Sequence, residues 1–267
     1  MTKYAQNYMK LSVVVLTKNE ENNITRCIRS VKRLLIKLPS NSGELIIIDD
    51  RSTDKTVHLA IQLGAKVHER SLNGNWADQR NFALTKTKGE WVLFVDADEV
   101  VSEDLAREII TKISRAAIEI KGFYFRRYDY IFGRLLTHGE IGSQRLLRLA
   151  RRGSGTWMRA VHEFWAIKGE VYTMDNAIGH HPHQSLNEFI SDVNTMAVIH
   201  ARQNYDDGKR SSLAKILIWP TVKFIYNYLF KLGVLDGMQG FVVAIVMSFH
   251  SFLAWSNLWL IQVKKKN

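Results

Sequence analysis

The chain has 267 residues, a net charge of +11 and one cysteine, Cys27. Its hydrophobic share of 46% and charged share of 24% are typical of a globular protein and exclude a largely disordered chain. One cysteine excludes an intrachain disulfide, and residues 1–10 are too polar for a secretory signal, so we expect a reducing, cytoplasmic setting. The positive charge favours an anionic partner. Because no recognised nucleic-acid-binding motif is present, we expect a nucleotide or an anionic lipid surface and no nucleic acid.

Strands and helices alternate through the first hundred residues. Buried strands are expected at 11–16, 45–48, 65–69 and 91–95, with helices at about 24–35, 54–63 and 76–86 between them. The connections between these elements are short. This alternation predicts an α/β fold with a parallel sheet and right-handed crossovers.

Polar clusters follow three of these strands, at residues 17–20, 49–54 and 96–99. The carboxyl ends of parallel strands meet at one edge of a sheet, so the three clusters should share one rim. The sequence contains neither G-x-G-x-x-G nor the P-loop motif. It therefore predicts neither the dinucleotide-binding nor the Walker-type phosphate site at that rim.

The third cluster has the sequence D-A-D-E. Asp96 and Asp98 directly follow an apolar strand and are separated by one small residue. Two carboxylates at this spacing can hold a divalent cation that shares its other ligand positions with phosphate oxygens. The alternative is an acidic turn that leads into a helix beginning near Ser102. We assign Glu99 to that helix entry.

The middle of the chain extends the sheet. A helix is expected at 102–118, and strands are expected at 122–130, 146–149 and 164–171, in mixed directions. Ser185 can cap a helix that continues to about residue 205.

The composition changes near residue 209. Residues 216–230 are apolar and aromatic with lysines at intervals, and residues 241–263 carry no charged side chain before three lysines. We predict a helical hairpin that lies in a membrane interface with its lysines near anionic headgroups. The alternatives are helices packed on the rest of the chain or on a second subunit, and a true membrane span.

The strand-end motifs resemble those of a known family. They are V-V-V-L-T-K-N-E-E-N from Val13, I-D-D-R-S-T-D from Ile48, Q-R-N-F-A-L from Gln79 and D-A-D-E from Asp96. In order and spacing they resemble family 2 inverting glycosyltransferases of the GT-A fold. The resemblance implies a Rossmann-like, mostly parallel mixed sheet flanked by helices. Residues 1–208 would be the catalytic domain, with a nucleotide-sugar half at about 10–100 and an acceptor half at about 101–208. Residues 209–267 would form a helical appendage that associates with a membrane or dimerises.

Further motifs in the second half of the chain resemble a subgroup that contains lipopolysaccharide core β-glucosyltransferases. These motifs are Gly133-Arg134, His138-Gly139, Arg145, Val161-His162-Glu163, His180, Ser185-Leu186 and Gly233-Val234-Leu235-Asp236-Gly237.

The resemblance implies a nucleotide-sugar site across the strand ends. Thr17 and Asp50 would contact the uracil and the ribose, Glu20 would lie near the ribose, and Asn19 belongs to the same set. A carboxylate such as that of Asp50 is suited to accept from the uracil N–H. Arg80 would reach the pyrophosphate, to which a guanidinium makes paired charge-assisted bonds. A surface salt bridge is the alternative role for Arg80.

The D-A-D stretch would be the D-x-D motif of the family. Asp98 would bind Mn²⁺ or Mg²⁺ directly, and Asp96 would support the ribose or the metal. His180 would be a further metal ligand, with His181 and His183 as neighbouring alternatives. The cation would stabilise the departing nucleoside diphosphate.

Inversion at the sugar carbon requires a base on the face opposite the leaving group. Glu163 occupies the V-H-E position of the subgroup and is the candidate base, with Asp129 and Glu140 as alternatives. A salt bridge or a cap is the structural alternative for Glu163. The G-S-Q stretch at 142–144 departs from the aromatic and acidic residues of the subgroup, which leaves the acceptor contacts of that loop unassigned.

These assignments imply an enzyme that moves a sugar, glucose from UDP-glucose, onto a lipid-linked saccharide such as lipopolysaccharide core. It would be peripheral on the inner face of the cytoplasmic membrane, with a homodimer as one possible state. One alternative is a glycosyltransferase that acts on another glycolipid, a polysaccharide or a peptide. Others are a nucleotidyltransferase or sugar-phosphate transferase, and a non-catalytic, membrane-tethered nucleotide-sugar-binding protein.

Overall fold

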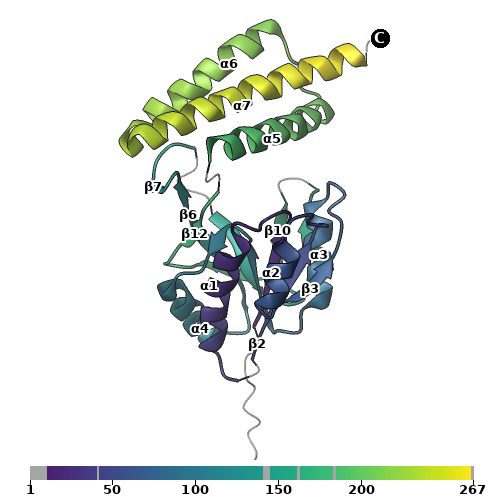
Figure 1. Cartoon of the computed structure of the whole chain (residues 1–267), viewed down its shortest axis with the longest axis vertical. Helices are drawn as coiled ribbons and strands as arrows, with labels where there is room; N and C mark the ends of the chain where they lie inside the picture. The colour runs from purple at the N-terminus through teal and green to yellow at the C-terminus, as the bar shows by residue number, and fades with distance from the viewer. Residues whose placement is uncertain (1–10, 41, 141–144, 161–162, 183–184, 266–267) are drawn as a thin grey trace, which may run out of the picture. The chain divides into compact units, whose positions relative to one another are not determined.

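The computed structural model describes residues 11–40, 42–140, 145–160, 163–182 and 185–265 (Figure 1). Within these ranges the chain forms two compact units. The first contains the described residues of 1–127 and 144–180, and the second contains those of 128–143 and 181–267. The sequence suggested a boundary between two domains at residue 208, and that boundary stays a prediction.

The strands of the structure are numbered in chain order. They are β1 (Leu11–Thr17), β2 (Gly43–Asp49), β3 (Lys66–Glu69), β4 (Trp91–Asp96), β5 (Glu99–Val100), β6 (Ile120–Ile131), β7 (Arg134–Leu136), β8 (Arg145–Arg151), β9 (Gly155–Met158), β10 (Phe164–Ile167), β11 (Glu170–Thr173) and β12 (Ile178–His180).

The helices are named in the same way. They are α1 (Ile24–Ile36), α2 (Thr56–Gln62), α3 (Trp76–Lys86), α4 (Glu103–Arg115), α5 (Leu186–Asp206), α6 (Leu213–Ile225), the π-helix η1 (Tyr226–Phe230), the 3₁₀-helix η2 (Gly233–Asp236) and α7 (Gly237–Lys264).

Four parallel strands form the base of the first unit in the order β3-β2-β1-β4. The register places Thr17 beside Asp49, and Leu16 beside Asp96. The predicted strand–helix alternation and its parallel sheet are therefore confirmed. β8 then pairs antiparallel with β4, and β6 pairs antiparallel with β8, which makes the sheet mixed.

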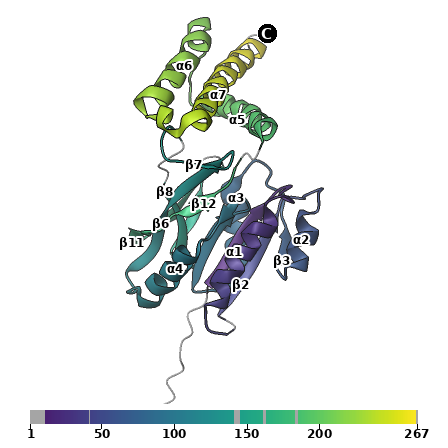
Figure 2. The same cartoon turned by 60° about the vertical axis from the view of Figure 1, so that its left-hand side comes forward.

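Successive residues of β1 and β4 are buried on both faces of the sheet, which explains their unbroken apolar sequence. On one face, α1, α2 and α4 cover a core that contains Val13, Ile47 and Leu93. On the other face, α3 packs with Trp157 and Trp165 of the β9–β10 hairpin. Figure 2 shows α1 lying along the sheet. Helices on both faces leave the strand ends as the open edge of this unit.

The prediction of a single strand at 164–171 is wrong. This stretch consists of β10, which pairs with β9, and β11, which pairs with β6. Gly169 lies between them with a φ of 130°, a conformation that favours glycine and lets the chain turn. The helix predicted at 102–118 also ends earlier, at Arg115.

Helices dominate the second unit, where α7 packs against α5, α6 and β7. Ser185 is the N-cap of α5, and its hydroxyl accepts from the Glu188 N–H at 3.2 Å, as the sequence predicted. Phe189 and Val193 of α5 share a core with Val243 and Val246 of α7. The predicted hairpin is present as α6 with η1, followed by α7.

Glu44 lies at the amino ends of the parallel strands, opposite the ends that carry the polar loops. Glu44 accepts from Ser12 Oγ at 2.6 Å and from the Lys88 N–H at 2.7 Å. Burial alone would raise the pKa of Glu44, but these hydrogen bonds and the charge of Lys66 lower it below 4.5. An acid with a lowered folded-state pKa adds stability above its unfolded pKa and loses it as the pH falls through the lowered value.

We therefore expect the free energy of unfolding of wild type to exceed that of Glu44→Gln at pH 7, and the difference to shrink as the pH falls below about 4.5. Urea unfolding at several pH values measures this difference. A difference that stays constant from pH 7 to pH 3 would contradict the assignment.

Candidate functional site

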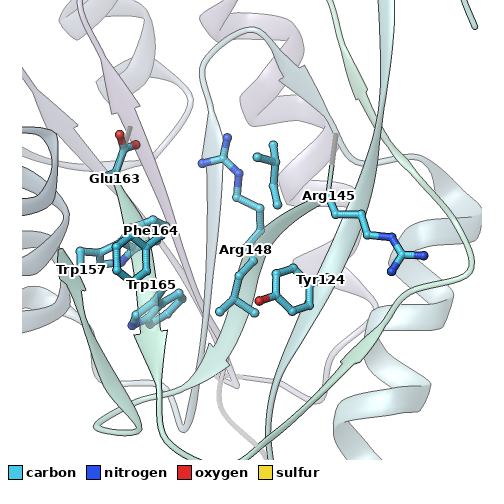
Figure 3. A pocket seen from close by; sticks show the side chains of 9 residues that line it. Tyr124, Arg145, Arg148, Trp157, Glu163, Phe164 and Trp165 are labelled. Atoms are coloured by element: carbon cyan, nitrogen blue, oxygen red, sulfur yellow. The ribbon is translucent and has the colours of Figure 1, made fainter. Parts of the chain in front are cut away.

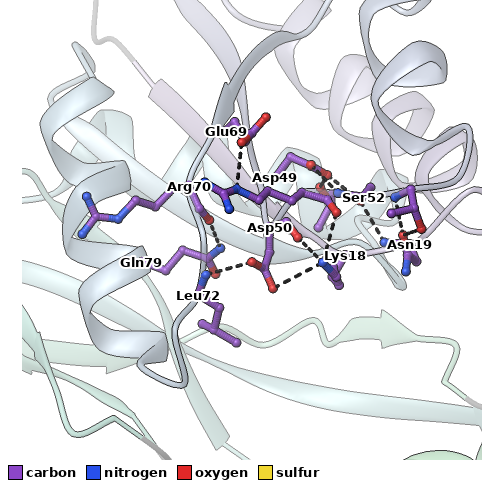
Figure 4. Close-up of polar contacts among 12 residues, drawn as sticks. Lys18, Asn19, Asp49, Asp50, Ser52, Glu69, Arg70, Leu72 and Gln79 are labelled. Atoms are coloured by element: carbon purple, nitrogen blue, oxygen red, sulfur yellow. Dashed lines mark hydrogen bonds and ion pairs between the residues drawn. The ribbon is translucent and has the colours of Figure 1, made fainter.

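The ends of β1 and β2 are joined by side-chain hydrogen bonds (Figure 4). Thr17 Oγ1 donates to Asp49 Oδ1 at 2.9 Å, and Asp49 also accepts from the Ser52 N–H at 2.8 Å. Asp49 is buried, with 2% of its surface exposed. It therefore holds the two loops together from inside, a role that the sequence did not reveal because Asp49 and Asp50 are adjacent and identical.

Asp50 faces the other way, towards the loop that follows β3 (Figure 4). It accepts from the Leu72 N–H at 2.8 Å, and the Lys18 ammonium lies 3.9 Å from its second oxygen. Asp50 remains about one-fifth exposed, so this predicted nucleotide contact lies at the rim while Asp49 lies below it.

Asn19 and Glu20 complete the first loop. The Asn19 N–H donates to Ser52 Oγ at 2.9 Å, and Asn19 Oδ1 accepts from the Thr53 N–H at 2.8 Å. Glu20 accepts from Asn23 Nδ2 at 2.9 Å. Asn19 has a φ of 54° and Arg51 a φ of 51°, so each loop makes a left-handed turn two residues beyond its strand. The structure thus brings together the predicted nucleotide-binding residues of both loops.

Asp96, the first acid after β4, lies between two arginines. Arg80 Nη2 is 3.1 Å and Arg148 Nη1 is 3.2 Å from Asp96 Oδ1, and Arg148 Nη2 contacts the other oxygen. Burial alone would raise the pKa of Asp96, but the charges of Arg148 and Arg80 outweigh it and hold that pKa well below its usual range. Asp96 is therefore ionised and fixed in place.

Arg80 links this acid to the candidate base. Its Nε donates to Glu163 Oε1 at 3.0 Å, and its guanidinium lies over Trp157 at 4.7 Å from the ring centroid. Only 3% of Arg80 is exposed, so it is a buried bridge and not the surface salt bridge considered as its alternative. Its Nη1 has no hydrogen-bond partner among the described residues.

The assignment of Glu99 to the helix entry is wrong. Glu99 lies in β5 and is fully buried, and Ser102 is the N-cap of α4, its hydroxyl accepting from the Leu105 N–H at 3.1 Å. Glu99 Oε2 accepts from the Asp96 N–H at 2.9 Å, and Oε1 lies 3.3 Å from Arg148 Nη2. Burial raises the pKa of Glu99, and Arg148 partly opposes that effect. Glu99 is therefore part of the support beneath Asp96.

Asp98 and His180 converge at the same edge. β12 pairs with β5, which places His180 beside Glu99, and His180 Nε2 lies 3.0 Å from Asp98 Oδ2. Asp98 makes no ion pair with lysine or arginine within the described ranges. No cluster of three or more histidine, cysteine, aspartate or glutamate ligands occurs among the residues that the structure describes. Asp98 and His180 therefore offer two ligands, one carboxylate and one imidazole.

The alternatives from the sequence lie elsewhere. His181 stacks on Tyr130 in the second unit, with ring centroids 4.8 Å apart. Asp129 is fully buried, and Glu140 accepts from Lys223 Nζ at 2.6 Å, both also in the second unit. Residues 142–144, Val161, His162 and His183 lie outside the described residues.

A cavity of about 180 Å³ adjoins Glu163 (Figure 3). Strands β6, β8, β9 and β10 contribute its walls. Its lining residues are Tyr124, Arg145, Leu146, Leu147, Arg148, Trp157, Glu163, Phe164 and Trp165. Acidic groups, a base candidate and a cavity thus meet beside the carboxyl end of β4, where open α/β sheets bind their ligands.

The model of the family described as glycosyl transferase family 2 matches residues 12–172, which include all of these strand-end loops. The chain belongs to glycosyltransferase family 2. It is thus a glycosyltransferase, and its mixed sheet flanked by helices is the GT-A fold that the sequence motifs implied.

Two relatives align over nearly the whole chain. An uncharacterized glycosyltransferase of Rickettsia typhi is 30% identical over 97% of this chain and 89% of its own length. The lipopolysaccharide core biosynthesis glycosyltransferase LpsC of Rhizobium meliloti is 29% identical over 94% of this chain and 92% of its own length.

Among solved structures, the mannosyltransferase PcManGT from Pyrobaculum calidifontis, in complex with GDP-Man and Mn²⁺, has a similar fold. The TM-score is 0.55 at 15% identity, with 95% of this chain and 88% of that chain covered. A likeness at this level concerns the fold and not the ligands.

The buried network under Asp96 gives a stability prediction. We expect Glu99→Ala to lower the free energy of unfolding by about 3 kcal/mol, because it leaves the Asp96 N–H without its acceptor and Arg148 with one carboxylate fewer. Glu99→Gln should cost less, since an amide oxygen can still accept. Urea denaturation measures both.

The control is Glu119→Ala, an exposed acid of the same unit, which should change the free energy of unfolding by less than about 0.5 kcal/mol. Equal stability of Glu99→Ala and wild type would show that Glu99 does not support Asp96.

Proposed function

We propose that this family 2 glycosyltransferase is a metal-dependent, inverting enzyme. It moves a sugar from a UDP-sugar, with UDP-glucose as the first candidate donor, to a lipid-linked saccharide such as lipopolysaccharide core. The observation that carries the proposal is the convergence of Asp98 with His180 and of Glu163 with Arg80 beside the end of β4. These pairs supply the two functions that inversion requires, stabilisation of a leaving group and abstraction of a proton.

The nucleotide would lie across the ends of β1 and β2. The rim position of Asp50 supports a contact with the uracil N–H, and Thr17, Asn19 and Glu20 shape the adjoining loop. Nη1 of Arg80 is buried and has no partner in the described ranges, which supports a contact with the diphosphate, because an unpaired buried donor is unfavourable until an acceptor arrives.

The donor set at Asp98 and His180 fits Mn²⁺ or Mg²⁺. A carboxylate oxygen and an imidazole nitrogen 3.0 Å apart can hold one cation, and phosphate oxygens commonly complete such sites. When bound, the cation offsets charge that develops on the departing nucleoside diphosphate. Asp96 is engaged by two arginines, which supports a role in shaping the site over a role as a direct ligand.

Glu163 would take the proton of the acceptor hydroxyl. Its carboxylate lines the cavity, and the bond from Arg80 Nε fixes one oxygen at 3.0 Å. A base that is already oriented before the acceptor arrives loses less freedom at the transition state.

A surface of the second unit supports membrane association. Leu213, Ile218, Phe230 and Met238 are exposed on α6, η1 and α7, and residues 209–267 carry eight lysines and arginines but one acid, Asp236. In the described part of the chain, the stretch Gly233–Lys264 is long and apolar enough to cross a membrane by length and composition. Lys215 and Lys223 of α6 and Lys231 directly after η1 support an interfacial position on an anionic surface over a full span. A homodimer contact at this surface is the alternative.

The metal assignment predicts the effect of one substitution. Asp98→Ala should reduce turnover of UDP-glucose by about 100-fold or more at saturating Mn²⁺, since it removes a charged ligand at the leaving group. Release of UDP measures turnover, with UDP-N-acetylglucosamine and GDP-mannose as competing donors.

Asp104→Ala, an exposed acid on α4, is the matched control and should keep wild-type turnover. Full activity of Asp98→Ala would remove the metal role. Pyrophosphate as product would favour a nucleotidyltransferase, and UDP binding without turnover of any donor would favour a non-catalytic binding protein.

The membrane surface gives a separate prediction. Ile218→Glu combined with Phe230→Glu should lower binding to vesicles that contain anionic phospholipid by about tenfold or more, because both side chains are exposed and would meet the apolar layer. UDP binding should not change. Vesicle co-sedimentation measures the first effect.

Ile36→Glu is the control, since Ile36 is 79% exposed on α1 of the first unit. Equal loss of vesicle binding in the control would point to a nonspecific charge effect, and unchanged binding in the double variant would contradict the surface.

A further inference from the structure

The cavity beside Glu163 has two differently charged ends. Figure 3 shows Glu163 and Arg145 on opposite sides of it, with Arg148 and Tyr124 between them. Its volume of about 180 Å³ is below the roughly 300 Å³ at which pockets for drug-sized ligands begin, which suits one sugar ring.

Aromatic rings provide apolar faces around the cavity. Phe164 is 50% exposed and Tyr124 is 37% exposed, although both are large and mainly apolar. Trp157 and Trp165 also line the cavity; they are buried and stack with ring centroids 5.1 Å apart. Half-exposed rings on a rigid base are suited to the apolar face of a ring-shaped polar ligand.

The charges of the lining residues do not balance. Glu163 is bound by Arg80, and Arg148 is bound by Asp96 and Glu99. Arg145 is exposed, and its guanidinium has no hydrogen-bond or ion-pair partner among the described residues. One positive charge at the cavity is therefore left without a counter-charge from any described residue.

The position of Arg145 on the sheet increases this imbalance. Arg145 of β8 lies directly opposite Arg126 of β6, and Arg126 is itself exposed. Like charges directly opposite in an antiparallel pair destabilise the sheet. Within the part of the chain that the structure describes, the Arg126 guanidinium is bonded only to a neutral group, the Asp175 carbonyl, at 2.8 Å. An anion beside the two arginines would offset their repulsion.

Arg148 adds a second donor to the cavity. It is 95% buried, and its Nε has no hydrogen-bond partner among the described residues. An unpaired buried donor in a cavity wall is rare in native structures and indicates a polar ligand or an ordered water. A hydroxyl of a bound sugar would supply the missing acceptor.

We propose that this cavity is the acceptor site and that it selects an acidic saccharide, a sugar that carries a carboxylate or a phosphate. The anionic group pairs with Arg145, the ring lies against Phe164 and Tyr124, and the reacting hydroxyl lies at Glu163 on the opposite side. The assignment rests on the proposed function, in which Glu163 is the base. It places the anionic group across the ring from the reacting hydroxyl or on the adjoining sugar.

The test compares ligands that differ in one group. Methyl glucoside, methyl glucuronide and glucose 6-phosphate are bound to the full chain saturated with UDP, and dissociation constants are measured by ligand-observed NMR. We expect the two acidic ligands to bind about tenfold more tightly than methyl glucoside, the ratio that one charge-assisted hydrogen bond supplies. The glucuronide and the phosphate separate the two sources of charge.

Arg145→Gln should reduce the preference to about twofold and leave the affinity for methyl glucoside and for UDP unchanged. Arg145→Lys should retain most of the preference. Arg115→Gln is the matched control. Arg115 is exposed on α4 of the same unit, and its substitution removes an equal charge. It should keep the full preference.

Equal binding of the neutral and acidic ligands to wild type would overturn the inference, as would an unchanged preference in Arg145→Gln or an equal loss in Arg115→Gln. Its failure is distinct from that of the proposed function. Turnover of UDP-glucose without acid selectivity removes only this inference, whereas acid selectivity without any turnover leaves the saccharide site and removes the enzymatic reaction.

Discussion

The ion pairs between Asp96 and two buried arginines connect β4 with α3, β8, β5 and the segment that carries Glu163. Asp96 ends β4, Arg80 comes from α3, and Arg148 comes from β8. Arg80 continues to Glu163, and Arg148 continues to Glu99. Each arginine is at least 95% buried, so its permanent charge would be costly to bury without these carboxylates. Loss of one member would leave a buried charge unpaired and would also disturb elements that are far apart in the sequence.

The acids at the strand ends therefore divide into two groups. Asp49 and Glu99 are buried and hold loops or an arginine from inside, whereas Asp50 and Asp98 remain partly exposed at the rim. In each loop a supporting acid lies within one residue of an acid that faces solvent. This arrangement fixes the exposed carboxylate, because its neighbour already satisfies the backbone of the turn, as Asp49 does for Ser52 and Glu99 does for Asp96.

The parallel sheet and its polar rim were predictable because they follow from local patterns. Continuous apolar runs, the capping residues Ser102 and Ser185 and the spacing of the strand-end motifs each act within a few residues. The roles of Glu99 and Arg148 were not predictable. Arg148 lies 52 residues from Asp96 in sequence. In the sequence of β8, where arginines are separated by apolar residues, it resembles an ordinary surface arginine. Glu99 reads as a helix-entry acid until β12 is seen to pair with β5.

The two left-handed turns at Asn19 and Arg51 order the rim before a ligand binds. A non-glycine residue in this conformation costs roughly 1–2 kcal/mol, yet both turns are held by bonds between the loops. That cost is met when the chain folds. A ligand that reaches the rim meets loops that are already ordered, so little of its binding free energy is lost in arranging them.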